Sequence, residues 1–369
     1  ADTFYYSRDT KVHLTDSAGA IYKIPVLDGF SFSQATNATE VTLNEMATST
    51  GVSRRARQMF TDSYAPAEWS FQTYIRPFKS GGGGSGEHGA VAHHMVEEAL
   101  WNALAGSAAV GVSGTALTAD GTDANIAFTN SNKVALDTFD LFFEMGTGKA
   151  NPTIYKIEGC VVNEVSIDFD IDGIATANWS GMGKIITEES SMTTATIYEG
   201  TAAADTNNFI RNRLTDLTVT ATTAEDIVGT YTLTLTGGNI TVSNNMTFLT
   251  PETLGIVNQP LGHVTGTRSV SGNFTCYLNT PASGASSADL FEDILESTST
   301  TTNDFNLVFV IGGTGNTPRV TMTLPTCHLE VPSHSIDDII SLETTFHALP
   351  TSVDATDEIT MEFVGPTVT

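Results

Sequence analysis

The sequence contains few cysteines, and they follow no recognised spacing. Cys160, Cys276 and Cys327 are the only three, and none of them belongs to a Cys-x-x-Cys pair. This excludes a disulfide framework and a zinc knuckle, so we expect three buried thiols in a protein made in a reducing cytoplasm. No apolar run is as long as a membrane span, and the first residues lack the apolar stretch of a signal peptide.

Basic residues are also scarce. The chain has 16 basic and 42 acidic residues, which gives a net charge of −26. Such a chain repels nucleic acid and anionic membranes at long range, which excludes a broad basic face that grips DNA. A strongly acidic protein can still lie close to DNA if its function is not to bind the DNA. The charged fraction of only 16% and the apolar fraction of 40% argue against disorder and allow a core.

The sequence lacks the motifs of common enzyme chemistry. It has no Gly-x-Ser-x-Gly, and no nucleophile, base and orienting residue can be assembled. The glycines of residues 81–86 approach the spacing of a phosphate loop, but Glu87 and His88 stand where a Walker loop has Lys and Ser or Thr. Residues 166–173 open like a calcium loop, yet its twelfth position is Trp179 instead of Glu. We therefore predict no enzyme, no cofactor and no metal, with calcium at 166–173 as the alternative to a strand.

An internal repeat is the most informative pattern present. Residues 138–165 align with 304–331, which places Phe139 against Phe305 and Cys160 against Cys327. Three further matches follow the same order: 69–75 with 272–278, 97–106 with 288–297, and 12–16 with 212–216. The sequence thus predicts a tandem duplication, with a first domain at 1–200 and a second at 201–369.

Each half alternates apolar and polar residues over many short stretches and contains one helical stretch, near 89–105 and 286–297. This pattern predicts a mainly β fold made of two tandem copies of a β-sandwich or partly closed β-barrel domain, each with one flanking α-helix. The polar face of the first helix, with His93, His94, Glu97 and Glu98, is expected to be solvated.

Trp101 is an aromatic residue on that polar face, and Phe291 matches it in the second half. An exposed aromatic of this kind is covered either by a loop of its own chain or by another subunit. We take contact with another subunit as the prediction for both residues.

Charged residues form two local patterns. Asp168, Asp170 and Asp172 alternate with apolar residues, which predicts a strand that displays three carboxylates on one wet face. Arg54, Arg55 and Arg57 cluster in a long connection of an otherwise acidic chain, which indicates docking against acidic groups on another copy. A solvated loop is the alternative for the arginines.

Several stretches resemble the tail tube (major tail) proteins of long-tailed bacteriophages. They are residues 24–42, 69–78, 100–106 and 163–184 in the first half and 261–279 in the second. The resemblance implies a β-sandwich or β-barrel domain with a flanking helix, assembled as stacked six-fold rings around a channel that conducts DNA from capsid to host. It also implies that the early connection, here 44–67, reaches the adjacent ring.

The resemblance further implies a virion protein, made in the host bacterial cytoplasm, whose partners are itself and other tail proteins. DNA would pass through the acidic channel without specific binding, and no membrane would be contacted. Because each chain carries two copies of the domain, three chains would close a ring of pseudo-six-fold symmetry. Asp168, Asp170 and Asp172 would then line the lumen.

Two other classes of function fit a mainly β chain. A carbohydrate- or receptor-binding module of a virion is the alternative, but it needs an exposed aromatic platform, and the aromatics here mostly alternate with polar residues inside strands. A hydrolase on a β scaffold lacks its catalytic set.

Overall fold

The chain is mainly antiparallel β-structure with two α-helices, one in each half, as predicted. This computed structural model describes residues 4–41, 58–80, 93–106, 117–119, 123–128, 136–192, 197–198, 205–221, 229–250, 260–280, 285–296, 305–315 and 317–368. Within these residues no helix is long and apolar enough to cross a membrane.

The elements of the first half are η1 (Ser7–Asp9), β1 (Thr10–Thr15), β2 (Ile21–Ile24), β3 (Ser31–Glu40), β4 (Met59–Tyr74), β5 (Pro77–Lys79), β6 (His93–Met95), α1 (Glu98–Ala105), β7 (Leu117–Ala119), β8 (Ala124–Ala127), β9 (Phe139–Met145), β10 (Thr153–Asp170), β11 (Thr176–Gly183), β12 (Ile185–Glu189) and β13 (Ile197–Tyr198). The elements of the second half are η2 (Asn212–Leu214), β14 (Asp216–Ala221), β15 (Thr230–Thr232), β16 (Thr234–Ser243), β17 (Thr247–Leu249), β18 (Gly262–Val264), β19 (Ser269–Tyr277), α3 (Ser287–Glu296), β20 (Phe305–Ile311), β21 (Arg319–Leu329), β22 (Ser333–Ile336), β23 (Ile340–Leu349) and β24 (Thr360–Val364).

The first half forms two sheets that share the long strand β10. One sheet has the order β3, β4, β11 and the second part of β10. The other has the order β2, β1, β9, the first part of β10, and β12. Register shifts between Ile157 and Cys160, and between Val162 and Glu164, lie where β10 passes from one sheet to the other. Such bulges bend a strand, so one strand can serve two sheets.

The second half has the same strand order. Strands β16, β19, β23 and β22 correspond to β3, β4, β11 and the second part of β10. Strands β15, β14, β20, β21 and β24 correspond to β2, β1, β9, the first part of β10, and β12. Beyond a register shift, Cys160 pairs with Phe139 and Cys327 pairs with Phe305, as their alignment in the sequence predicts.

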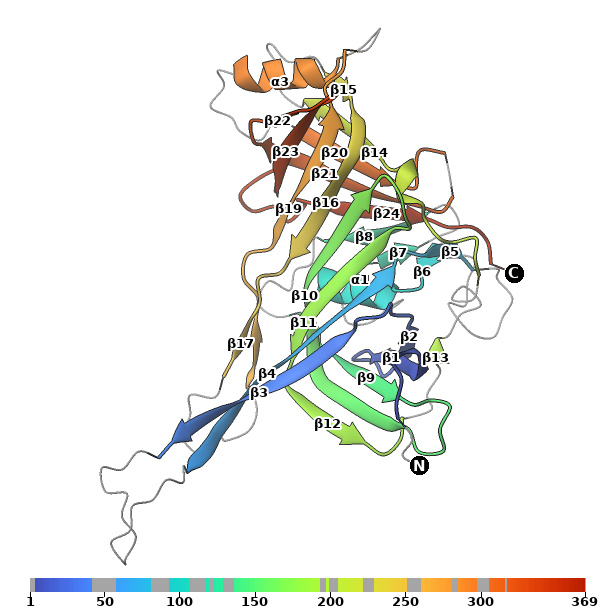
Figure 1. Ribbon diagram of the computed structural model, residues 1–369, viewed down its shortest axis with the longest axis vertical. Coiled ribbons are helices and arrows are strands. Elements are labelled where there is room, and N and C mark those ends of the chain that lie inside the picture. Colours follow the sequence, from blue (N-terminus) through green and yellow to red (C-terminus); the bar gives the residue numbers. More distant parts are fainter. Residues whose placement is uncertain are drawn as a thin grey trace, which may run out of the picture.

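The two halves are joined edge to edge. Residues Glu164–Asp170 of β10 pair with Ser243–Gly237 of β16, so one sheet of each half continues into the other. We call the result the long sheet; its order is β3, β4, β11, β10, β16, β19, β23, β22 (Figure 1). The small hairpin β7–β8 of the first half also pairs with β24 of the second.

The core follows from the alternation along these strands. In β11 every second residue is buried, and Trp179 is 1% exposed. The same alternation in β19 and β23 buries Phe274 and Phe346. Successive side chains of a strand point to opposite faces of the sheet. The apolar residues therefore cover one face of the long sheet, and the opposite face remains open to water.

The helix of the first half differs from the prediction. It begins at Glu98, while His93 belongs to strand β6. The face expected to be solvated is buried: His94 lies 3.0 Å from Glu98, and the Nδ1 of His93 accepts a hydrogen bond from the backbone N–H of Gly365. The reason is tertiary, because the C-terminal segment of the second half lies along β5 and covers this face.

Candidate assembly and channel surfaces

The open face of the long sheet is polar along its whole width. Neighbouring strands place short neutral side chains opposite one another, for example Ser166 beside Asn178 and Asn239 beside Asn273. Carboxylates lie among them. The side chains on this face include Ser31, Ser33, Glu68, Ser70, Gln72, Glu164, Ser166, Asp168, Asp170, Thr176, Asn178, Ser180, Asn239, Thr241, Ser271, Asn273, Thr275, Glu343, Thr345 and His347, and no lysine or arginine is among them. The face is therefore wet and negative.

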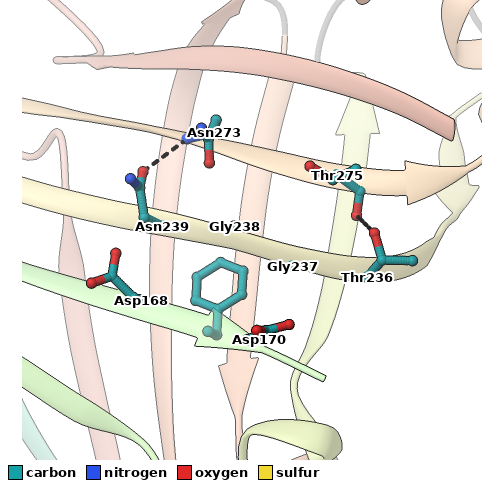
Figure 2. A pocket seen from close by; sticks show the side chains of 9 residues that line it. Asp168, Asp170, Thr236, Gly237, Gly238, Asn239, Asn273 and Thr275 are labelled. Atoms are coloured by element: carbon teal, nitrogen blue, oxygen red, sulfur yellow. Dashed lines mark hydrogen bonds between the residues drawn. The ribbon is translucent and has the colours of Figure 1, made fainter. Parts of the chain in front are cut away.

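A shallow hollow lies on this face where the two halves meet (Figure 2). Asp168 and Asp170 border it on β10, and β16 and β19 complete it. Asn239 accepts a hydrogen bond from the backbone N–H of Asn273 at 3.1 Å. Carboxylates, amides and hydroxyl groups, which are mostly found exposed to water, thus make up the polar lining of the hollow, and Phe169 and two glycines complete it.

The structure places two of the three predicted carboxylates together. Asp168 and Asp170 are exposed on β10. The apolar residues that alternate with them, Ile167 and Phe169, are 1% and 3% exposed. The strand ends at Asp170, so the predicted alternation stops there. Asp172 lies in the turn that follows, where its Oδ1 is 2.9 Å from the guanidinium of Arg213. The sequence alone does not reveal where the strand ends, because the alternation continues past it.

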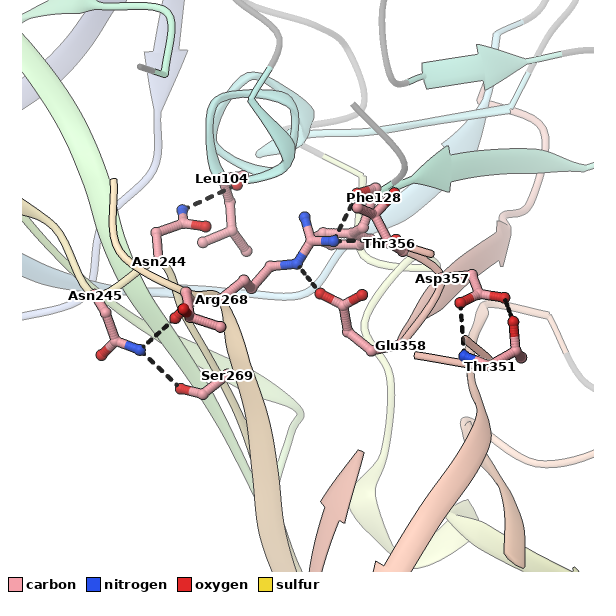
Figure 3. A network of polar contacts seen from close by, with 11 residues as sticks. Leu104, Phe128, Asn244, Asn245, Arg268, Ser269, Thr351, Thr356, Asp357 and Glu358 are labelled. Carbon is pink, nitrogen blue, oxygen red and sulfur yellow. Dashed lines mark hydrogen bonds and ion pairs between the residues drawn. The ribbon is translucent and has the colours of Figure 1, made fainter. Parts of the chain in front are cut away.

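Buried polar contacts hold the two halves together on the other side of the sheet (Figure 3). Arg268, at the start of β19, lies 2.5 Å from the carboxylate of Glu358 and donates to the backbone oxygens of Thr356 and Phe128. Phe128 belongs to the first half and the other residues to the second. Asn244 likewise donates to the carbonyl oxygens of Leu104 and Val162 in the first half. These hydrogen bonds therefore tie the two halves to each other.

A second group of buried polar contacts lies at the segment that connects the two halves. The guanidinium of Arg76 donates to Asn208 and to the backbone oxygen of Asp205, and its Cζ lies 4.3 Å from the ring centre of Phe209. The backbone N–H of Arg76 donates to the carboxyl group of Glu97. Complete burial raises the pKa of Glu97 to about 7, against the opposing effect of Arg76.

This raised pKa predicts a loss of stability as the pH rises. The unfolded chain releases the Glu97 proton near the usual pKa of 4.5, whereas the folded chain holds it up to about 7. Between these values the unfolded state binds fewer protons, so the free energy of unfolding falls with rising pH. Denaturant titrations across this range should show a shallower fall for Glu97→Gln than for the unmodified chain. Equal slopes would mean that Glu97 is ionised in the folded protein.

The two predicted aromatic contacts differ in outcome. Trp101 is 0% exposed and packs edge-on against Trp179 at 4.8 Å, so it is covered by its own chain and is not available to another subunit. The prediction that Trp101 contacts another subunit was wrong, because every residue of α1 is buried within the chain. Phe291 is half-buried and lies edge-on against His334 of β22, with ring centres 4.5 Å apart. Its contact with another subunit stays a prediction.

The ends of β3 and β4 form an arm that projects from the body (Figure 1). We define the arm as residues 37–40 and 59–63. Of the connection expected at 44–67, the part from Met59 onward is thus strand. Met59 and Phe60 are 56% and 65% exposed on the arm. Arg54, Arg55 and Arg57 lie outside the described residues.

The second half has a counterpart of the arm in the hairpin of β17 and β18. This hairpin packs against the first half of its own chain: Phe248 is 7% exposed and lies in a small apolar cluster with Leu136 and Val161. His263 accepts a hydrogen bond from the backbone N–H of Leu136. One hairpin therefore has its partner inside the chain, whereas the apolar side chains of the arm are exposed.

These features define a structural protein with an acidic open face, an exposed arm and a long sheet whose outer strands, β3 and β22, each pair on one side only within the described residues. Residues 81–278 match the family model of the phage tail tube protein, and the chain belongs to this family. It is also 29% identical over 343 residues to the tail tube protein pb6 of Escherichia phage T5, covering 91% of this chain and 69% of that protein. The chain is therefore a structural component of the phage virion, and the prediction of a tail tube protein is confirmed.

Proposed function

We propose that this chain is a duplicated tube domain, without catalytic activity, and that three chains close each ring of the tail tube. The same strand order in both halves supports the duplication, with domains at 1–200 and 201–369. The single observation that carries the ring is the β10–β16 junction, because it joins two domain copies side by side through one continuous sheet. Repetition of this step by three chains gives six domain positions.

The open face of the long sheet lines the channel in this assembly. Its neutral hydroxyl and amide groups keep it wet, and its carboxylates repel the phosphates of DNA. Binding of DNA to proteins draws largely on release of counterions by lysine and arginine, and this face carries neither among the residues named above. DNA therefore passes without specific binding, and Asp168 and Asp170 are lumen residues.

The arm contacts the next ring. Its exposed Met59 and Phe60 have no cover within the described part of the chain, whereas the corresponding hairpin of the second half is covered by its own chain. Arg54, Arg55 and Arg57 lie between the two strands of the arm in the sequence and supply positive charge against an acidic neighbour.

Reversal of the three arginines to glutamate should impair stacking of rings while each chain remains folded. The reason is that attraction between the arm and an acidic neighbour becomes repulsion, which salt screens only at distances beyond about 8 Å at physiological ionic strength. Tube length by electron microscopy and circular dichroism of the variant check this. Tubes of normal length at moderate salt would show that these arginines are only solvated.

Electron microscopy of the purified protein tests the proposed function itself. Rings or tubes with a central channel are the expected result, after incubation at high protein concentration. A protein that stays a monodisperse monomer and instead binds glycans or host-cell surfaces would support the receptor-binding alternative.

A further inference from the structure

The two outer edges of the long sheet match the two strands that meet inside the chain. We infer that β22 of one chain pairs antiparallel with the start of β3 of the next chain, in the register of the internal β10–β16 junction. This inference rests on the proposed ring and adds the residues that close it. The occupant of each edge is a second copy of the chain.

The internal junction supplies the register. Ser166 of β10 pairs with Thr241 of β16, and Asp168 pairs with Asn239. The positions of β10 recur in the second half 167 residues later, as Cys160 and Cys327 show by their equal pairing. Asn163 and Glu330 then occupy equivalent places, where each strand skips one residue against its neighbour.

The equivalent positions of β16 lie in β3. Trp69 of β4 and Gly272 of β19 are equivalent by the repeat, and their partners are Phe32 and Ile240. Applying the β10–β16 register to the equivalent residues of β22 and β3 gives four residue pairs between neighbouring chains. They are Ser333 with Ser33, His334 with Phe32, Ser335 with Ser31, and Ile336 with Phe30.

The side chains at the two edges complement each other in this register. Inside the chain, Phe169 of β10 packs on Phe309, with ring centres 5.6 Å apart. Gly238 lies opposite Phe169, and a Cβ there would meet the Phe169 ring at 2.8 Å. At the outer edges the aromatic ring is on β3 instead of on the strand that corresponds to β10. Ile336 takes the place of Phe169, and Phe30 takes the place of Gly238. Phe30 already stacks at 5.8 Å on Phe143, which is the counterpart of Phe309.

The exposed apolar surface at β22 favours the same partner. Ile336 is 79% exposed, and Val331 and Ile339 on either side of β22 are 58% and 60% exposed. A free strand edge with apolar side chains is a ready template for another strand. Pairing with β3 of a second copy covers Ile336 and places Ser333 and Ser335 on the polar face, in line with Ser31 and Ser33.

Disulfide trapping tests the register. The double variant Ser335→Cys with Ser31→Cys places two thiols directly opposite each other across the seam, within reach of a disulfide. The native thiols interfere little, because all three are buried. On oxidation of assembled protein, we expect covalent dimers and closed trimers on a non-reducing gel, and no larger species.

The matched controls are the two single variants and the displaced pair Ser335→Cys with Ser33→Cys. The displaced positions are diagonal neighbours about 7–8 Å apart, so cross-linking should be much weaker. Tubes without cross-links from the in-register pair, or stronger cross-linking from the displaced pair, would overturn the seam but leave the tube function intact. Absence of any assembly by the unmodified chain would count against the proposed function instead.

A charge at the seam gives an independent readout. Ile336→Lys places an ammonium group against Phe30 and should abolish rings, while circular dichroism shows a folded monomer because the residue is exposed in the single chain. Val353→Lys is the control, since Val353 is 100% exposed and follows the end of β23 opposite to Ile340, the residue that pairs with Ile336. Rings of normal yield from Ile336→Lys would contradict the seam.

Discussion

Arg268→Ala is expected to lower the free energy of unfolding by about 3–5 kcal/mol, the usual cost of removing one partner of a buried ion pair. The side chains of Arg268 and Glu358 are only 16% and 9% exposed, so the remaining carboxylate has little water to replace its partner. Two backbone oxygens, of Phe128 and Thr356, lose their donor at the same time. Since Phe128 belongs to the first half, the junction between halves loosens as well. Urea titration of the variant and the unmodified chain measures this effect.

Arg213→Ala provides the matched control for this ion pair. Arg213 also pairs with a carboxylate, Asp172, but these side chains are 70% and 85% exposed. Exposed pairs contribute about 0–1 kcal/mol, so the control should remain close to the unmodified chain. Equal losses for Arg213→Ala and Arg268→Ala would show that the buried network does not hold the halves together.

Asp168→Lys combined with Asp170→Lys is expected to leave tube assembly intact and to slow DNA ejection strongly. Both carboxylates are exposed, so their replacement costs little folding stability. In a ring of three chains, two lysines per chain place six positive charges around the channel at every level of the tube. Each lysine that contacts a phosphate releases counterions, and the resulting adhesion grows with the number of contacts. Ejection rates from phage particles that carry the variant measure the effect.

Salt separates adhesion from a blocked channel. Adhesion by lysine weakens steeply as salt increases, so ejection by the lysine variant should recover at higher salt. The neutral variant Asp168→Asn with Asp170→Asn is the control and should eject DNA at close to the normal rate. A lysine variant that ejects DNA normally at low salt would place these two residues outside the channel.

Much of the fold could be predicted because similar local patterns occur in both halves of the sequence. The alignment of Cys160 with Cys327 agrees with the structure, in which the two cysteines pair with Phe139 and Phe305. Alternation likewise predicted the core face of β10, with Ile167 and Phe169 buried.

The failures of prediction have a common physical cause, which is packing between segments far apart in the sequence. The polar face of α1 is buried because the C-terminal segment covers it, and Trp101 packs against Trp179 of a distant strand. The end of β10 at Asp170 was missed because Ile171 continues the alternation although it is 44% exposed. Pairing of β10 with β16 across the two halves is equally invisible to local patterns.

Electron cryomicroscopy of the assembled tube tests the central claim most directly, because it counts the chains in a ring and orients the long sheet. The structure leads us to expect three chains per ring, six domain positions around the channel, and the face of Asp168 and Asp170 directed toward the lumen. A ring of six chains with twelve domains, or a long sheet whose polar face lies on the outside of the tube, would contradict it.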